Sequence, residues 1–371
     1  MPEPATHSDH EDGARLRLRI AQVAPLYEAV PPQAYGGTEL IVHLLTEELV
    51  RRGHDVTLFA TGDSVTRARL VAGSPEPLWN SHSGRLPPGE AERLRSAHHR
   101  RPYADGESFD LIHDHSGQLG LAAATEAGAE RVLVTHHREA DDPTRALLAR
   151  YRGRHVAVSA SAAATYPYHG QVAPVLHGID VASYPFAERS QGYLLFLGRF
   201  APEKGAAVAV RVAQRTGRRL LLAGRIHDFD RPAFERDVAP FLDDRIRYVG
   251  EADRVRKRSL LAGAEALLFP ITWNEPFGLV MIEALSCGTP VVATRRSSTP
   301  EVVEPGETGF LAGAGNGDEA DVEALTAVLP DIPLISRARC RQVAERRFTV
   351  SRMVDDYERR YAEVGTSAPA W

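Results

Sequence analysis

The stretch YLLFLGRFAPEKGAAVAVRVAQR, Tyr193–Arg215, contains the strand, the turn and the helix that decide the predicted fold. Its first residues are a short apolar run that ends at Gly198, which is typical of a buried strand. Gly205 lets the backbone turn tightly, and the run AAVAVRVAQR that follows predicts a helix. A buried strand followed by a helix is the repeating unit of a doubly wound parallel sheet, so this stretch predicts an α/β protein.

The same alternation of strand and helix runs along both halves of the chain. In the first half the predicted strands are RIAQVAP, DVTLFAT, FDLIHDH, RVLVTHH and HVAVSAS. In the second half they are YLLFLG, RRLLLAG, RIRYVG, EALLFP and PVVAT. The segment TELIVHLLTEELVRRG, between the first two strands, has a helical pattern that Gly53 can terminate. We therefore predict two Rossmann-like, doubly wound domains, each large enough to bury its own core.

The domain boundaries follow from this pattern. The predicted parts are a disordered tail at 1–14, a first domain at 15–176, a linker at 177–192, a second domain at 193–348, and a C-terminal helix and tail at 349–371. The final helix, roughly Val350 to Val364, follows another helical segment with no strand between them. We expect it to pack back across the linker onto the first domain.

The segment Gly73 to Gly106 interrupts the alternation, which favours an insertion. Its basic part, AERLRSAHHRRPY, could meet an anionic acceptor or a membrane surface. We favour a solvated helix face for this part.

The composition excludes several classes of function. A net charge of -5 argues against nucleic acid as the main partner, because binding to a phosphate backbone needs a basic face. The two cysteines, Cys287 and Cys340, are too few for a disulfide scaffold or a zinc site, which favours a cytoplasmic protein. No apolar run approaches the roughly 20 residues that span a bilayer, and the first residues lack the apolar core of a signal peptide.

Lysine is rare in this chain, which has 44 basic residues but only two lysines, Lys204 and Lys257. Arg199 lies five residues before Lys204, at a predicted strand end. Ligands of open parallel sheets bind outside the carboxyl ends of the strands. A guanidinium can bridge two phosphate oxygens and an ammonium can neutralise the remaining charge, so the pair suits a diphosphate. Two solvated surface cations are the alternative.

A second candidate site lies in WNEPFGLVMIEALSCGTPVV, Trp273–Val292. Pro276 suits the first turn of a helix, so we predict that a helix begins there. Glu275 then lies just before the helix, and Glu283 lies about two turns into it. The backbone N–H groups between the two carboxylates are those of Phe277, Gly278 and Leu279. Such a site offers carboxylates to sugar hydroxyls and N–H donors to an anion, although an ordinary helix start has the same pattern.

Together these segments resemble the retaining family-four glycosyltransferases of the GT-B fold. EPFGLVMIE has the family's two glutamates separated by seven residues, and GRFAPEKG, YVGEADRVRK, EALSCGTPVVAT and PEVVEPGETGFL occur in the family's order. In the first half PPQAYGGTE, HDH and VTHHR also match, and PPQAYGGTE resembles actinobacterial transferases of the avilamycin type that decorate natural products or polysaccharides. The resemblance implies two Rossmann-like domains that face each other across a cleft. It also implies transfer of a sugar from a nucleotide-diphosphate sugar, by default a UDP-sugar, to a hydroxyl of a natural product, saccharide or lipid.

The resemblance implies a role for each matching residue. Arg199 and Lys204 would hold the diphosphate, Glu275 would lie against the donor sugar and Glu283 would bind the ribose. His137 would reach the reacting sugar. The other implied donor-binding residues are Gly36, Gly37, Gly198, Gly250, Glu251, Ala252, Phe277, Gly278 and Leu279. No metal and no cofactor are implied, because cations and helix N–H groups would stabilise the leaving diphosphate.

Two features allow a second interpretation. Four histidines and Asp114 in HDH and VTHHR could suggest a metal site, but no further clustered ligand is visible and structural histidines are the more common outcome. Lys257 falls where relatives often carry a lysine near the donor pocket. For the run RVRKRS we nevertheless favour a solvated helix face.

The chain also departs from the family pattern near the expected donor pocket. The segment AGRIHD lacks the second glycine of many relatives, and Ser297 and Ser298 replace a Gly-Gly pair. The alternatives are a sugar-nucleotide epimerase or phosphorylase on the same fold, an NAD-dependent oxidoreductase, and a binding protein without activity. The glycine cluster in FLAGAGNGDEADVEAL fits the dinucleotide fingerprint poorly, because Asp318 occupies the place of its third glycine.

Overall fold

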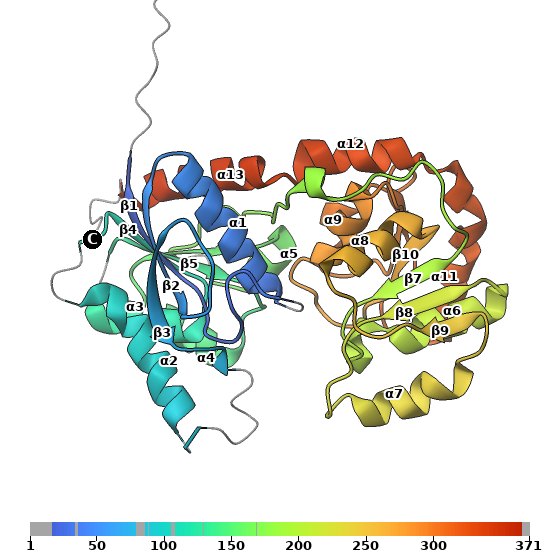
Figure 1. Ribbon diagram of the computed structural model, residues 1–371, viewed down its shortest axis with the longest axis horizontal. Helices are drawn as coiled ribbons and strands as arrows, with labels where there is room; N and C mark the ends of the chain where they lie inside the picture. Colours follow the sequence, from blue (N-terminus) through green and yellow to red (C-terminus); the bar gives the residue numbers. More distant parts are fainter. Residues whose placement is uncertain are drawn as a thin grey trace, which may run out of the picture.

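The computed structural model of the protein describes residues 17–33, 36–78, 86–87, 89–104, 108–128, 130–167 and 169–365. Two lobes lie side by side, and each is built on a parallel sheet with helices packed against it (Figure 1). The predicted tail, residues 1–14, lies outside the described residues. The prediction of two facing Rossmann-like domains is confirmed.

The first lobe contains a six-stranded sheet with the order β3-β2-β1-β4-β5-β6, in which every neighbouring pair is parallel. Its strands are β1 Arg19–Val23, β2 Asp55–Thr61, β3 Arg69–Ser74, β4 Leu111–Asp114, β5 Val132–His136 and β6 Arg154–Ala157. Its helices are α1 Gly37–Arg51, α2 Glu90–Arg100, α3 Gln118–Ala127, α4 Asp142–Leu148 and α5 Ala160–Ala163. The five predicted strands are confirmed. The prediction omits β3, because this edge strand is mostly half-buried or exposed and lacks a continuous apolar run.

The second lobe repeats the arrangement with the order β12-β11-β10-β7-β8-β9, again with parallel pairs. Its strands are β7 Leu194–Leu197, β8 Leu220–Ala223, β9 Ile246–Tyr248, β10 Ala266–Phe269, β11 Val291–Ala293 and β12 Gly309–Leu311. Its helices are α6 Ala206–Thr216, α7 Arg231–Asp237, α8 Arg254–Gly263, α9 Leu279–Ser286, α10 Thr299–Val302, α11 Glu319–Val328 and α12 Arg337–Arg347. Only β12, a strand of three residues, is missing from the prediction.

Short 3-10 helices connect some of these elements, namely η2 Arg101–Tyr103, η3 Val181–Ser183, η4 Pro202–Lys204, η5 Ala239–Phe241 and η6 Leu329–Leu334. Most apolar residues of each sheet and its helices form cores within one lobe, and a further cluster joins Val158 of the first lobe to residues of the second. None of the helices in the described ranges is long and apolar enough to cross a membrane.

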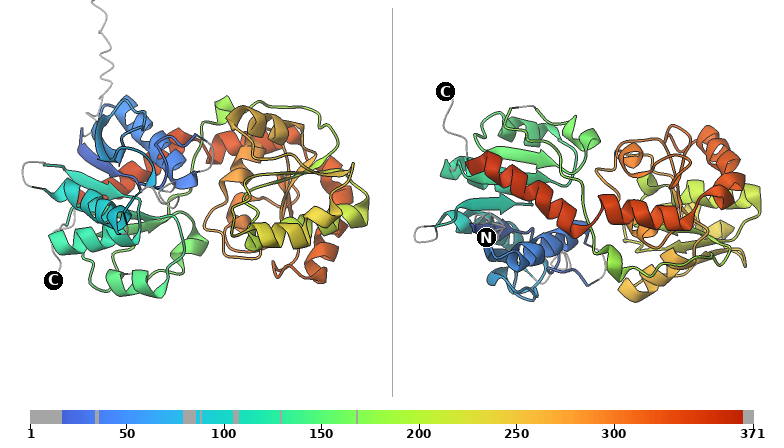
Figure 2. Two further views of the ribbon diagram at one scale, coloured as in Figure 1. Left: turned by 60° about the horizontal axis from the view of Figure 1, so that its bottom comes forward. Right: turned by 90° about the horizontal axis from the view of Figure 1, so that it is seen from above.

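The last helix, α13 Val350–Gly365, leaves the second lobe and lies along the first (Figures 1 and 2). It packs against α1, β4 and β5, and it buries Met353, Tyr357 and Tyr361 in the core of the first lobe. The chain crosses between the lobes at Ile179, whose N–H donates to Phe348 O at 2.8 Å. The predicted return of the final helix to the first domain is therefore confirmed.

The prediction that the segment 73–106 is an insertion is wrong for its described residues, which belong to the alternation of strands and helices. Helix α2 connects β3 to β4 and packs against α3 and β3. His98 and His99 on this helix are buried. Nε2 of His98 lies 2.9 Å from Ala24 O, and Nδ1 of His99 lies 3.2 Å from Asp114 Oδ2. The expectation of a solvated helix face is therefore wrong for this side of α2, because the two imidazoles fill space beside the sheet.

Arg52 fixes α13 to α1. Its side chain is 2% exposed and donates to Asp355 Oδ1 at 2.6 Å and to Glu358 Oε2 at 2.8 Å. We predict that Arg52→Met lowers the free energy of unfolding by about 2 kcal/mol, the scale of a lost hydrogen bond to a charged group. Urea denaturation measures this. The matched control is Arg51→Met, because Arg51 is exposed and bonds only to Glu48 among the described residues, so little change is expected. Equal effects of the two substitutions would contradict this account.

Candidate functional site

The predicted diphosphate residues lie at the switch point of the second sheet. Strands β7 and β10 are neighbours in this sheet, although β8 and β9 separate them in sequence. Arg199 follows β7, Lys204 ends η4, and Glu275 follows β10. Ligands of doubly wound sheets bind in the crevice where the strand order reverses, so the topology places these three residues beside it.

Lys204 is paired with the first glutamate of the predicted motif. Its Nζ forms an ion pair with Glu275 Oε2 and lies 4.6 Å from the centre of the Trp273 ring. Nε1 of Trp273 donates to the same carboxylate oxygen at 3.0 Å. A Cβ at Gly205 would collide with Pro270 O, so the glycine is what lets η4 approach the end of β10. The alternative of a solvated surface cation is wrong for Lys204.

Arg199 lies nearby in a separate cluster. Its Nη2 donates to Glu203 Oε1 at 2.9 Å, and its guanidinium lies 5.6 Å from the centre of the Phe229 ring. Its Nε is 3.8 Å from Asp230 Oδ2, and neither atom has a hydrogen bond among the described residues. The carbonyl of Glu203 accepts from Thr272 N at 2.9 Å, which joins this cluster to the loop that carries Glu275.

Lys257 is paired with the second glutamate. Glu283 on α9 has a buried side chain, and its Oε1 lies 2.5 Å from Lys257 Nζ on α8. The Tyr184 hydroxyl donates to the same oxygen at 2.8 Å, and burial raises the pKa of this tyrosine. The expectation that Lys257 belongs to a solvated helix face is therefore wrong. The two lysines of the chain each hold one glutamate of the EPFGLVMIE motif.

The helix between these glutamates begins later than predicted. Helix α9 starts at Leu279, not at Pro276, because Gly278 has a left-handed φ of 81°. Ser298 Oγ lies 2.8 Å from Glu275 O and 2.9 Å from Phe277 O, and these contacts hold the segment in a non-helical path. The N–H groups at the start of this helix are therefore those of Leu279 and Val280, because Met281 N already donates to Gly278 O at 3.0 Å.

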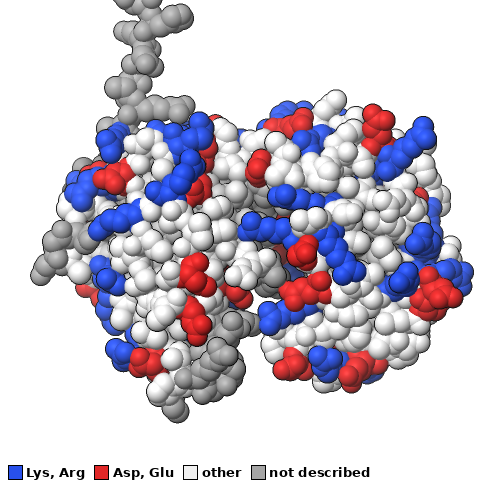
Figure 3. All heavy atoms as spheres, in the orientation of Figure 1, with Lys and Arg blue, Asp and Glu red and all other residues white. Residues whose placement is uncertain are grey.

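The segment that departs from the family pattern connects the two lobes. Ser297 has a φ of 53°, and it is the only residue other than glycine with a positive φ in the described ranges. Its hydroxyl contacts Ser161 Oγ at 3.2 Å and donates to Glu275 O at 2.8 Å. The Glu301 carboxylate accepts from Ala160 N at 2.7 Å and Ser161 N at 2.8 Å, both at the start of α5. Charged side chains of both signs gather along the hollow between the lobes (Figure 3).

The predicted glycine pair of the first lobe faces the start of α9. Gly36 and Gly37 lie at the N-terminus of α1, and a Cβ on Gly37 would lie 3.4 Å from Leu279 Cδ1. Residues 34–35 of the same motif lie outside the described residues. The structure thus brings Gly37 of the first lobe and Leu279 of the second, which are far apart in sequence, next to each other.

The predicted base-binding residues lie at the other side of the second sheet. Gly250, Glu251 and Ala252 follow β9, and Gly250 O accepts from Gly224 N at 3.0 Å. Gly198 N donates to Ala223 O at 3.1 Å, so Gly198 closes the end of β7 against β8. No hydrogen bond or ion pair within the described residues joins Glu251 to Lys204 or Glu275. Gly198 directly precedes Arg199, whereas Gly250, Glu251 and Ala252 follow a strand two places further along the sheet.

His137 follows β5 and contacts other imidazoles. Its Nε2 lies 3.1 Å from His115 Nδ1, and its ring stacks on that of His177 at 5.3 Å between centres. The His177 ring in turn packs on Phe277 at 4.9 Å, so aromatic contacts connect His137 to the EPFG segment. Burial lowers the pKa of His137 to about 3, which keeps its imidazole neutral. His177 belongs to the connection HGID, where no sequence pattern marks it.

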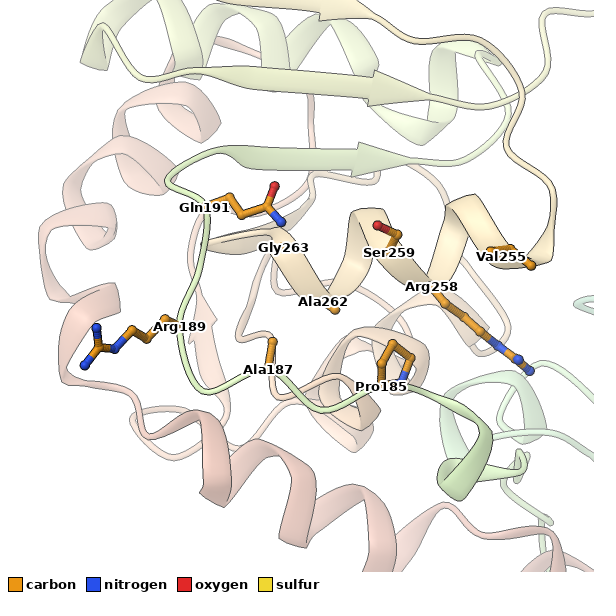
Figure 4. A pocket seen from close by; sticks show the side chains of 9 residues that line it. All are labelled: Pro185, Ala187, Arg189, Gln191, Val255, Arg258, Ser259, Ala262 and Gly263. Atoms are coloured by element: carbon orange, nitrogen blue, oxygen red, sulfur yellow. The ribbon is translucent and has the colours of Figure 1, made fainter.

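One surface cavity of the second lobe contains none of the predicted site residues. It has a volume of about 420 Å³ and lies between the connection Pro185–Gln191 and helix α8 (Figure 4). Arg258 on its wall lies 4.9 Å from the Tyr184 ring, and the hydroxyl of Tyr184 donates to Glu283 Oε1. Tyr184 therefore connects this cavity wall to the Lys257–Glu283 pair.

In the glycine cluster on which the oxidoreductase alternative depends, a side chain of the protein already binds the backbone N–H groups. The Asp321 carboxylate accepts from Ala314 N at 2.7 Å, Gly315 N at 3.0 Å and Gly317 N at 2.6 Å. These are the N–H groups that a pyrophosphate would need. For the metal alternative, the described part of the chain contains no group of three or more His, Cys, Asp or Glu side chains arranged to hold an ion.

Glu39 lies beside the glycine pair at the start of α1, where its side chain is buried. Burial raises the pKa of this carboxyl from 4.5 to about 7. The folded protein therefore binds the proton more tightly than the unfolded chain does. The resulting stabilisation is complete below a pH of about 4.5 and is lost as the pH rises through about 7.

We predict that Glu39→Gln, which cannot ionise, is more stable than the wild type by roughly 3 kcal/mol above pH 7 and by little near pH 5. Denaturant titrations across this range measure the difference. Glu48→Gln on the same helix should act in the opposite sense, because a hydrogen bond from Arg51 lowers the pKa of Glu48. A stability difference between Glu39→Gln and wild type that does not vary with pH would contradict the burial of a titrating carboxyl.

Two families match consecutive parts of the chain. Residues 35–182 match the family described as Glycosyltransferase Family 4, and residues 185–347 match the family described as Glycosyl transferases group 1. Together they cover most of the described residues. The resemblance that the motifs indicate is therefore confirmed, and the comparisons give no support to an epimerase, a phosphorylase or an oxidoreductase.

Individual relatives agree with this assignment. The phosphatidyl-myo-inositol mannosyltransferase of Mycobacterium leprae is 27% identical over 389 residues, which cover 94% of this chain and 98% of the relative. The crystal structure of AviGT4, a glycosyltransferase involved in avilamycin A biosynthesis, is 26% identical, with a TM-score of 0.70 and coverage of 95% and 99%. The structure of HepE from Anabaena with UDP and glucose has a TM-score of 0.71 at 18% identity, with coverage of 94% and 100%, and shows the same fold. The chain belongs to the glycosyltransferases of the GT-B fold, with a family 4 domain followed by a group 1 domain.

Proposed function

We propose that this glycosyltransferase moves a sugar from a nucleotide-diphosphate sugar, with a UDP-sugar as the first candidate, to a hydroxyl acceptor with retention of anomeric configuration. One observation carries the proposal: the two lysines of the chain pair with the two glutamates of the EPFGLVMIE motif, Lys204 with Glu275 before α9 and Lys257 with Glu283 on α9. The two pairs provide separate contacts for the sugar and for the ribose of one donor.

The diphosphate would lie against Lys204 and Arg199. Both side chains are largely buried, and Lys204 directly precedes Gly205 and the start of α6, where backbone N–H groups and the helix dipole favour an anion. When the phosphate reaches Lys204, it would replace Glu275 as the partner of the ammonium. Glu275 would then be free to accept hydrogen bonds from the sugar hydroxyls, while Trp273 keeps hold of its carboxylate.

The ribose would lie against Glu283. Lys257 and Tyr184 both bind Oε1, so they fix the orientation of this buried carboxylate. Oε2 of Glu283 has no hydrogen bond among the described residues. A carboxylate oxygen accepts well from the paired hydroxyls of a ribose, and two fixed donors on the other oxygen would align it for that contact.

The chemistry needs stabilisation of the charge that develops on the leaving diphosphate. Preorganised cations and N–H groups in a cleft that excludes water can supply it, so we propose a reaction without a metal ion. The acceptor would attack from the same face as the departing phosphate, and that phosphate would take the acceptor proton. Activity that persists in EDTA, with a product of retained anomeric configuration by NMR, would support this scheme. Strict dependence on added Mg²⁺ or Mn²⁺ would overturn its metal-free form.

The acceptor classes come from the relatives. One of them is a phosphatidyl-myo-inositol mannosyltransferase and another takes part in avilamycin A biosynthesis, so a lipid headgroup, a saccharide and a natural product are all to be tested. A melting-temperature screen against UDP, GDP, ADP and TDP identifies the nucleotide first, because a ligand that binds only the folded protein raises its apparent stability. No shift with any nucleoside diphosphate at millimolar concentration would contradict the proposed donor.

We predict that Lys204→Ala lowers turnover about 100-fold or more while the protein stays folded, because it removes a charge that stabilises the leaving group. Steady-state kinetics with the donor identified in the screen measure this. Arg215→Ala on α6 is the matched control, since it removes an exposed cation that pairs with Glu319, and its turnover should equal that of the wild type. A folded Lys204→Ala protein with unchanged turnover would remove Lys204 from the mechanism.

A further inference from the structure

A continuous chain of buried hydrogen bonds connects the C-terminal helix to His137. The Tyr361 hydroxyl on α13 lies 3.2 Å from Gln22 Nε2 on β1. Gln22 Oε1 lies 2.9 Å from His115 Nε2, and His115 Nδ1 lies 3.1 Å from His137 Nε2. Gln22, His115 and Tyr361 are all at least 97% buried, so water does not compete for these contacts.

The amide of Gln22 determines the direction of this chain. Its carbonyl oxygen can only accept, so Nε2 of His115 carries the proton of that contact. A neutral imidazole has one N–H, and therefore Nδ1 of His115 is an acceptor. Nε2 of His137 must then carry the proton and donate to it. Burial lowers the pKa of His115 far below its ordinary value and that of His137 to about 3, so the one-proton condition holds for both rings.

The other side of the same amide is consistent with this direction. Gln22 Nε2 donates to the Tyr361 hydroxyl and lies 3.4 Å from His113 Nδ1, and that hydroxyl lies 2.9 Å from the same Nδ1 and can donate to it. His113 Nε2 then donates to Thr135 Oγ1 at 2.7 Å. One amide orientation thus specifies the Nε2–H form of all three imidazoles, and the opposite orientation would specify the Nδ1–H form of all three.

We propose that Gln22 is a positioning residue for the proposed reaction, which holds His137 in its Nε2–H form and leaves Nδ1 as an acceptor for a hydroxyl of the donor sugar. Nδ1 of His137 has no hydrogen bond among the described residues. The stack on His177, which itself packs on Phe277, fixes the plane of the His137 ring. Because the His137 ring is neutral, its Nδ1 can accept a hydrogen bond from a sugar hydroxyl, and the ring forms no ion pair with the diphosphate. The sugar contact depends on the proposed function, whereas the proton position depends only on the hydrogen bonds.

The proton position is measured directly on the wild-type protein without any donor. ¹⁵N NMR of the histidine side chains at neutral pH distinguishes the two neutral forms. We expect the Nε2–H form for His113, His115 and His137. The Nδ1–H form at all three rings, or an average of both forms at His137, would overturn the proposal. This result is independent of whether the protein uses a nucleotide sugar.

The functional test compares Gln22→Leu with Tyr357→Phe. Leucine neither donates nor accepts, so the His137 signals should move toward an average of the two forms and kcat/KM for transfer should fall about tenfold, the scale of one hydrogen bond. Tyr357 lies on the same helix as Tyr361, but its hydroxyl contacts Thr135 at 3.2 Å, on the branch that leads away from His137. Tyr357→Phe should therefore leave the His137 signals and kcat/KM unchanged.

Two outcomes of this comparison contradict the positioning role. One is a Gln22→Leu protein with wild-type kcat/KM, and the other is a loss of activity while His137 keeps its Nε2–H signals. If Gln22→Leu does not fold, the wild-type NMR result decides. Failure of every nucleotide sugar with a wild-type protein that shows the Nε2–H form would count against the proposed function and leave the proton assignment intact.

Discussion

The neutralisation of two glutamates by two lysines is the constraint on which the donor side of the cleft depends. Glu275 and Glu283 are both largely buried, and an isolated buried carboxylate is costly. A lysine offsets this cost for each glutamate. Lys204 comes from η4 and Lys257 comes from α8. The two pairings anchor Glu275, which lies before α9, and Glu283, which lies on it. The first pairing also keeps an ammonium at the switch point, where in the proposed reaction a donor phosphate would replace Glu275 as the partner of Lys204.

The first lobe supplies the opposite wall through contacts that cross the cleft. Ser297 and Glu301 join the segment after β11 to the start of α5, and Gly37 faces Leu279. The C-terminal helix has a second role besides closing the core, because Tyr361 ends the hydrogen-bond chain that reaches His137. A helix from the end of the sequence is thus connected by hydrogen bonds to a histidine of the first half. The proposed site residues of the two lobes are therefore connected by packing and hydrogen bonds between the lobes.

Much of this arrangement could be predicted from the sequence, and the failures have physical causes. Strand and helix periodicities give ten of the strands and the crossing helix, because these features are local. The strands β3 and β12 escape prediction, since one is a partly exposed edge strand and the other has three residues. The start of α9 is wrong because Gly278 takes a left-handed conformation that Pro276 does not reveal. The basic run around Lys257 predicts a solvated face, because such a run carries no sign of which side meets α9. Gln22 and His177 act through tertiary contacts, which no spacing along the chain reports.

The most direct test of the central claim is a crystal structure with the nucleoside diphosphate that gives the largest melting shift. The account predicts that the β-phosphate lies within hydrogen-bond distance of Lys204 and Arg199, that Glu275 no longer binds Lys204, and that the ribose hydroxyls contact Glu283. A diphosphate seated away from Lys204, or held only through a bound metal ion, would contradict the account.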